Sequence, residues 1–183
     1  MIYLVGGAPR AGKTILAQQL SSTLKAGWVS TDLLMELLSV GNAAGIKGKW
    51  NADPVAITMN AEWFFPYLER FVWGVTSLAD QYVIEGVDFL PEQVTQLASQ
   101  YPIRTVFLGC SQMTLERFDR FPGRSQGYGS LPEARRRQIV QDVPRWSAFI
   151  RQEAEQWGYA YVDMVKDFSQ RLAEAELVLT TRT

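Results

Sequence analysis

The segment "GGAPRAGKT" occupies residues 6–14 and follows directly on the first apolar run of the chain. From Gly7 to Thr14 it matches the pattern G-x-x-x-x-G-K-[ST], which is meaningful between a buried strand and a helix. The sequence predicts both flanks, because residues 2–6 are apolar and apolar residues recur at helical spacing over 13–25. Glycines let backbone N–H groups point inward, and the helix N-terminus adds positive potential. The segment therefore predicts a phosphate-binding loop.

The residue types in this loop also indicate what it binds. In such loops the lysine, here Lys13, bridges the β- and γ-phosphates of a nucleoside triphosphate, and Thr14 supplies its hydroxyl to Mg²⁺. Arg10 would either contact a phosphate or face solvent, and the sequence leaves both outcomes open. The predicted nucleotide-binding residues are Gly7, Ala8, Pro9, Arg10, Ala11, Gly12, Lys13 and Thr14.

Strands and helices alternate along the rest of the chain. Strands are predicted at 2–6, 27–31, 81–89, 103–110 and 159–164, and helices at 13–25, 32–40, 54–78, from Pro91, at 111–121, 132–157 and 167–177. Pro66 is expected to kink or break its helix, and Ser111 to cap another. The alternation predicts an α/β fold, a three-layer α/β/α sandwich with a five-stranded parallel sheet. With 183 residues, the chain is expected to form one domain over 1–183.

The composition excludes several classes of function. The chain has no histidine and one cysteine, Cys110, which excludes a histidine base, an internal disulfide and a cysteine-based metal site. The formal net charge is −1, so we expect no nucleic-acid partner. No apolar run reaches the roughly 20 residues of a membrane span, and the first residues lack a basic signal-peptide region. These features predict a cytoplasmic location. Eight of the 13 arginines nevertheless lie between Arg117 and Arg151, a local basic patch suited to a phosphate-rich ligand.

Four motifs carry a more specific resemblance. "GGAPRAGKT", "VSTDLL", "VIEGVDFLP" and "LERF" resemble, in this order, motifs of 2-phosphoglycerate kinase. The chain is thus similar to small-molecule P-loop kinases of the adenylate-kinase-like group, and chloramphenicol phosphotransferases and zeta-toxin-like kinases share the scheme. The resemblance implies a P-loop NTPase fold that uses ATP and Mg²⁺. Where 2-phosphoglycerate kinases often carry histidine, this chain has Asp88, so the identity of the acceptor is left open.

The resemblance also implies roles for individual residues. Asp32 would face the acceptor hydroxyl or order a Mg²⁺-bound water, although it would equally serve as a helix cap. Glu85 would order Mg²⁺, with a buried structural ion pair as the alternative. Arg117, Arg120 and Arg124 would belong to a lid at about 117–131 that closes over the phosphates, unless they form a solvated face.

The segment at about 41–80 is expected to hold the acceptor. Lys47 and Lys49, and Asp88 farther along, are candidates to contact it. Its aromatic residues would line a pocket or, more commonly, pack against the sheet. They are Trp63, Phe64, Phe65, Tyr67, Phe71 and Trp73. The consecutive arginines 135–137 are expected to face mostly solvent.

These observations predict an ATP- and Mg²⁺-dependent kinase, a phosphotransferase acting on a hydroxyl or phosphate of a small molecule. Two other functions fit the same motifs: a nucleotide-binding module that hydrolyses ATP slowly without an acceptor, and a nucleotide or nucleotide-sugar kinase. The motifs predict neither a purine preference nor an oligomeric state.

Overall fold

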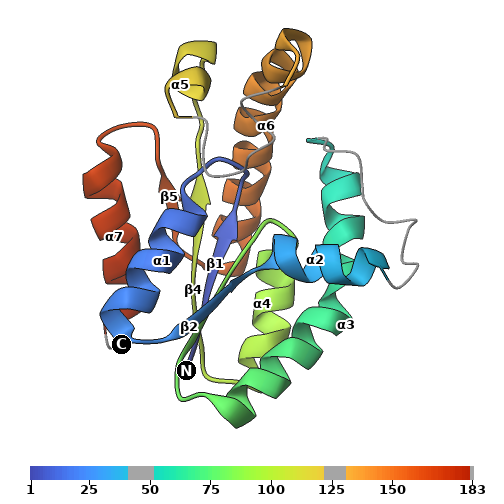
Figure 1. Ribbon diagram of the computed structural model, residues 1–183, viewed down its shortest axis with the longest axis vertical. Helices are drawn as coiled ribbons and strands as arrows, with labels where there is room; N and C mark the ends of the chain where they lie inside the picture. Colours follow the sequence, from blue (N-terminus) through green and yellow to red (C-terminus); the bar gives the residue numbers. More distant parts are fainter. Residues whose placement is uncertain (41–51, 122–130, 182–183) are drawn as a thin grey trace.

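The computed structural model describes residues 1–40, 52–121 and 131–181, and strands and helices alternate through them (Figure 1). The order is β1 Ile2–Gly7, α1 Lys13–Leu24, β2 Gly27–Ser30, α2 Thr31–Val40, α3 Pro54–Leu78, β3 Tyr82–Glu85, α4 Pro91–Ala98, β4 Ile103–Gly109, α5 Leu115–Arg120, α6 Glu133–Trp157, β5 Tyr161–Asp163 and α7 Phe168–Thr180. In this part of the chain, the predicted helices and strands are all present.

The strands form one parallel sheet in the order β2-β3-β1-β4-β5. This confirms the predicted five-stranded parallel sheet. Strand β1, which leads into the glycine-rich loop, lies between β3 and β4. The loop therefore begins in the middle of the sheet, between the ends of these two strands. Ligands of open parallel sheets bind beyond the carboxyl ends of such central strands.

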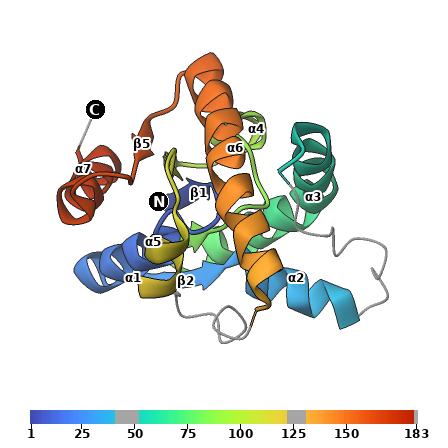
Figure 2. The ribbon, with the colours of Figure 1, turned by 90° about the horizontal axis from the view of Figure 1, so that it is seen from above.

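Alternating residues of the strands face two separate cores. On one face, Leu4, Ile84 and Phe107 pack with buried residues of α3, α4 and α6. On the other, Val5, Val83 and similar residues pack against α1 and α7. Seen from above, α1 and α7 lie on one side of β1, and α4 and α6 on the other (Figure 2). The predicted three-layer α/β/α sandwich is thus confirmed.

Two predicted element boundaries were wrong. Strand β3 ends at Glu85 rather than at residue 89: β2 ends opposite Glu85 at Ser30, and β1 continues to Gly7 paired with β4 alone. Helix α5 begins at Leu115 with Thr114 as its cap, whereas Ser111 was expected to cap it. The Ser111 amide instead donates to Asp163 Oδ1 at 3.2 Å, so a tertiary contact holds it outside the helix.

Helix α3 continues through Pro66, so of the two outcomes expected at this residue, a kink or a break, the break is excluded. A proline inside a helix removes one backbone hydrogen bond and usually kinks the helix. Here the fully buried Phe64 and Leu68 anchor the helix in the core on either side of the proline. Burial of two such side chains is worth about 1.5–3 kcal/mol each, comparable to the cost of the proline.

Parts of two predicted segments lie outside the described residues: residues 41–51 of the expected acceptor segment at about 41–80, and residues 122–130 of the expected lid at about 117–131. Within residues 1–40, 52–121 and 131–181, no helix combines the length and the apolar character needed to cross a membrane.

Candidate active site

The candidate site lies where three adjacent strands end. Val5 of β1 pairs with Glu85 of β3, and Ser30 of β2 pairs with the same Glu85. The three strands therefore reach the carboxyl edge of the sheet at one level. The segments that follow these strands carry the glycine-rich loop, Asp32 in the first turn of α2, and Asp88.

Backbone geometry at 7–12 requires glycine at two positions. Gly7 and Gly12 have φ values of 128° and 90°, in the left-handed region where glycine avoids a steric penalty. A Cβ at Gly7 would lie 2.0 Å from the carbonyl oxygen of Leu108. The neighbouring Ala8 amide donates to that same carbonyl at 2.8 Å. The loop is thus held against β4 by its own backbone.

Lys13 is buried in this loop, with 7% of its surface exposed. Its Nζ donates to the carbonyl oxygen of Ala8 at 2.8 Å, which spans the loop from one end to the other. Burial lowers the pKa of Lys13, and the negative charges of Glu85, Asp32 and Asp88 act against this shift. All three carboxylates therefore lie within electrostatic reach of the ammonium group.

Thr14 and Glu85 are in direct contact, as their places on neighbouring elements suggested. Thr14 Oγ1 donates to Glu85 Oε1 at 3.0 Å, and Glu85 is 3% exposed. A hydroxyl and a carboxylate are hard oxygen donors of the kind Mg²⁺ prefers, and nucleotide sites commonly hold Mg²⁺ with one or two protein oxygens. The donor set thus fits the predicted ion. Among the described residues, no group of three or more acidic or cysteine side chains is placed to hold a metal ion.

Asp32 lies in the first turn of α2 and is exposed. The helix begins one residue earlier, at Thr31, so Asp32 is not the residue that precedes the helix as an N-cap does. A carboxylate in the first turn still interacts favourably with the helix dipole, by about 0.3–1 kcal/mol. Its exposure leaves it accessible to a ligand at the sheet edge.

Asp88 is surrounded by two side chains that sequence reasoning did not single out. Thr31 Oγ1 donates to Asp88 Oδ2 at 2.5 Å, and Asn60 Nδ2 donates to Asp88 Oδ1 at 2.9 Å. Asp88 is 6% exposed, and this burial raises its pKa against the opposing effect of the hydrogen bond from Thr31. No local pattern marks Asn60, because it lies 28 residues away from its partner.

The arginines predicted for the lid have different surroundings. Arg117 donates to the carbonyl oxygens of Met164 and Val165 at 2.7 and 2.9 Å, which ties α5 to the loop after β5. Arg120 is exposed, with its guanidinium 5.4 Å from the ring centroid of Phe121. Arg124 lies outside the described residues.

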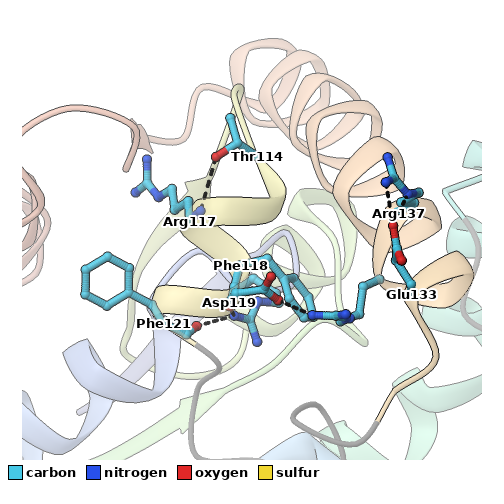
Figure 3. A network of polar contacts seen from close by, with 9 residues as sticks. Thr114, Arg117, Phe118, Asp119, Phe121, Glu133 and Arg137 are labelled. Carbon is cyan, nitrogen blue, oxygen red and sulfur yellow. Dashed lines mark hydrogen bonds and ion pairs between the residues drawn. The ribbon is translucent and has the colours of Figure 1, made fainter.

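One ion pair joins α5 to α6 on this side, and a second lies within α6 (Figure 3). Arg136 contacts Asp119 of α5 at 2.6 Å, and Arg137 pairs with Glu133 one turn earlier in α6. In Figure 3, Thr114 caps the start of α5 by accepting the Arg117 amide at 3.1 Å. Two of the three consecutive arginines therefore form surface ion pairs.

Arg10 neither faces the phosphate loop interior nor extends into bulk solvent. Its guanidinium donates to the carbonyl oxygens of Phe118 and Phe121 and lies 4.3 Å above the Phe118 ring. The residue has φ of 64°, in the left-handed region that residues other than glycine rarely adopt. Arg10 thus connects the cradle to the end of α5.

Most of the aromatic residues of α3 contribute to packing. Phe64 is fully buried, and Trp63, Phe65 and Phe71 pack against the same core. Tyr67 and Trp73 remain 42% and 48% exposed. Lys47 and Lys49 lie outside the described residues.

No protein-family model and no curated protein matches this sequence. Solved structures do resemble it. Shikimate kinase from Aquifex aeolicus VF5 is 15% identical with a TM-score of 0.52, over 98% of this chain and 96% of that one. Shikimate kinase from Bacteroides thetaiotaomicron is also 15% identical, with a TM-score of 0.53 over 96% and 94% of the two chains. At these identities the likeness concerns the fold, and the fold of this chain is that of these α/β proteins.

Proposed function

We propose that this protein is an ATP- and Mg²⁺-dependent kinase that transfers the γ-phosphoryl group of ATP to a hydroxyl or phosphate of a small molecule. The observation that carries the proposal is the convergence of a buried Lys13, the Thr14–Glu85 pair and the exposed Asp32 at one edge of the sheet. The structures that share the fold are named as shikimate kinases, and the assignment of kinase activity to this chain is our inference.

The residues of the chain divide the work by position. ATP, when bound, supplies the phosphoryl group, and its Mg²⁺ would neutralise part of the charge on the phosphates. Backbone N–H groups of the glycine-rich loop and the Lys13 ammonium would bind phosphate oxygens, and Thr14 and Glu85 would hold Mg²⁺. Asp32 would orient the acceptor hydroxyl and accept its proton. Of the two lid arginines that the structure describes, the exposed Arg120 has more freedom than Arg117 to reach a phosphate.

The test is an acceptor screen that follows ADP formation. Purified protein with MgATP is incubated with pooled sugars, amino alcohols, hydroxy acids and nucleotides, and active pools are divided until one acceptor is identified. We expect ADP to form only when an acceptor is present. Acceptor-independent ADP at a slow rate would instead support a regulatory ATPase, and activity on nucleotides alone would support a nucleotide kinase.

Lys13→Ala is the matched negative variant for this screen. We expect it to lose MgATP binding, because Lys13 provides the ammonium group within the loop. Isothermal titration with MgATP measures the loss directly. Wild-type affinity in Lys13→Ala would contradict the assignment of the loop as a nucleotide cradle.

A further inference from the structure

Side chains from two helices meet at the carboxylate of Asp88. Thr31 is the first residue of α2, Asn60 lies in α3, and Asp88 lies in the loop after β3. Thr31 is fully buried and donates to one carboxylate oxygen, while Asn60 is half-buried and donates to the other. We refer to Thr31, Asn60 and Asp88 as the carboxylate clasp.

The clasp is closely packed as well as hydrogen-bonded. A Cβ at Gly86 would lie 1.8 Å from Thr31 Oγ1 and 2.6 Å from Thr31 Cγ2. The first residue of α2 is therefore confined between the backbone at Gly86 and the carboxylate of Asp88. A rotation of the Thr31 side chain about its Cα–Cβ bond would move Oγ1 and break its hydrogen bond to Asp88.

The residue types in the clasp match their hydrogen-bonding roles. Thr31 and Asn60 both approach as donors, and an ionised carboxylate accepts at both of its oxygens. Burying such a group costs free energy unless it is well hydrogen-bonded. For the fold alone, an apolar contact at this place would be as stable or more so. A buried carboxylate next to the cradle therefore suggests a purpose beyond stability.

The clasp lies beside the groups assigned to the reaction. Asp32 directly follows Thr31 in α2, and the charges of Asp32 and Lys13 both act on Asp88. Asp88 is 6% exposed, so its carboxylate is not accessible to an acceptor in the way that Asp32 is. Its effect would be transmitted through Thr31 to the first turn of α2.

We propose that Asp88 is a positioning residue, which holds Thr31 and thereby sets the place of Asp32 relative to Lys13 and the cradle. Asn60 fixes the orientation of the Asp88 carboxylate and couples it to α3. The catalytic part of this inference rests on the proposed kinase function. The structural part, that Asp88 holds the first turn of α2, does not depend on it.

The experiment exchanges donor and acceptor within the clasp. In Asp88→Asn, the carboxylate charge is lost and one oxygen becomes an NH₂ group. Asn60 then keeps a partner at this residue only by turning its amide so that its oxygen accepts, and the hydrogen bonds that remain are neutral and weaker. The double variant Asp88→Asn/Asn60→Asp restores complementarity, because the amide at 88 then accepts from Thr31 and donates to the carboxylate at 60. Asp167→Asn serves as the control, since Asp167 is an exposed N-cap of α7, outside the expected acceptor segment, and asparagine caps helices equally well.

Two readouts are needed. Hydrogen exchange of the amides in residues 31–36 reports on the first turn of α2 without any acceptor. Turnover at saturating MgATP and acceptor, with MgATP affinity measured separately, reports on catalysis. We expect Asp88→Asn to speed exchange and to lower kcat by roughly 10²-fold, the typical effect of misplacement by about 1 Å. MgATP affinity should change little in the same variant.

The double variant decides between positioning and other roles. We expect it to recover both slow exchange and most of the lost kcat, while Asp167→Asn behaves as wild type. A double variant that remains as impaired as Asp88→Asn in either readout would overturn the proposal, because the charge at position 88 itself would then matter. If the wild type phosphorylates no acceptor, the kinase assignment fails, but the exchange data still decide whether Asp88 holds α2.

Discussion

Replacing Gly86 by alanine tests the packing at the start of α2 most directly. The added Cβ would lie 1.8, 2.6 and 2.7 Å from Oγ1, Cγ2 and Cβ of Thr31. Real Cβ contacts are longer than 3.0 Å, so Thr31 would have to move. The backbone at Gly86 is outside the left-handed region, so strain in φ does not contribute. The cost therefore comes from contact with Thr31 alone.

The magnitude follows from two contributions. Overpacking a buried site typically costs about 1–3 kcal/mol, and losing the charge-assisted hydrogen bond from Thr31 to Asp88 costs about 1.5–3 kcal/mol. The lower entropy of the unfolded alanine chain offsets about 0.4–1 kcal/mol. We therefore expect Gly86→Ala to lower the free energy of unfolding by about 2–5 kcal/mol, measured by urea denaturation monitored through tryptophan fluorescence.

Gly74→Ala is the matched control, because the same substitution is expected to have the opposite sign. Gly74 lies inside α3, and a Cβ there meets no atom within 4 Å. Alanine in a helix interior is favoured over glycine by about 0.5–1 kcal/mol, so this variant should be more stable than wild type. The double variant Gly86→Ala/Thr31→Ala should lose less than the sum of its parts. Wild-type stability in Gly86→Ala would refute the packing described for α2.

Three further outcomes are expected. Asp32→Asn should retain MgATP binding but lose about 10²–10⁴-fold in turnover, whereas Glu85→Gln should weaken the Mg²⁺ dependence of nucleotide binding. Nucleotide affinity is measured for both variants against Mg²⁺ concentration, together with turnover on the identified acceptor. If the two variants show each other's expected behaviour, the roles of Asp32 and Glu85 are reversed. Arg117→Ala should lower the free energy of unfolding by about 1–3 kcal/mol in denaturant titrations, because two loop carbonyls lose a charged donor, and Arg117→Lys should recover only part of it. Burial raises the pKa of Asp88 above its usual value of 3.8, so between these two pKa values the folded protein binds a proton that the unfolded chain has released. Relative to Asp88→Asn, the free energy of unfolding of the wild type should therefore rise as the pH falls from 7 to about 4. Denaturation curves across this pH range check this, and a constant difference between the two proteins would contradict it.

The fold could be predicted from the sequence because each strand, each helix and the glycine-rich loop is determined by residues that are close together in the chain. The apolar run before Gly7 and the helical spacing after Lys13 placed the cradle between β1 and α1. Alternation of short apolar runs with helical segments predicted the parallel sheet, since parallel strands need helical connections. The proximity of Thr14 and Glu85 then follows from the pairing of β1 with β3.

Contacts between distant segments could not be predicted in the same way. Asn60 reaches Asp88 from α3, and Arg117 reaches carbonyls 47 and 48 residues farther along the chain. Asn60 does not stand out from its neighbours in the sequence, and Arg117 was expected to close over phosphates rather than to bind these carbonyls. The cap of α5 illustrates the same limit, because Ser111 and Thr114 are both good capping residues. The choice of Thr114 depends on Asp163, which accepts the Ser111 amide from 52 residues away.

The exposure of the three carboxylates around Lys13 argues for different roles. Glu85 is 3% exposed and accepts from Thr14, so it is suited to an ion held beside that hydroxyl. Asp88 is 6% exposed and accepts from two buried or half-buried donors, so an acceptor molecule would have to displace Thr31 or Asn60 to reach it. Asp32 is exposed in the first turn of α2 and needs no such displacement. Because breaking a buried charge-assisted hydrogen bond costs about 1.5–3 kcal/mol, an acceptor would bind beside Asp32 in preference to Asp88. That difference supports Asp32 as the residue that contacts the acceptor, and Asp88 as the residue that holds Asp32 in place through Thr31.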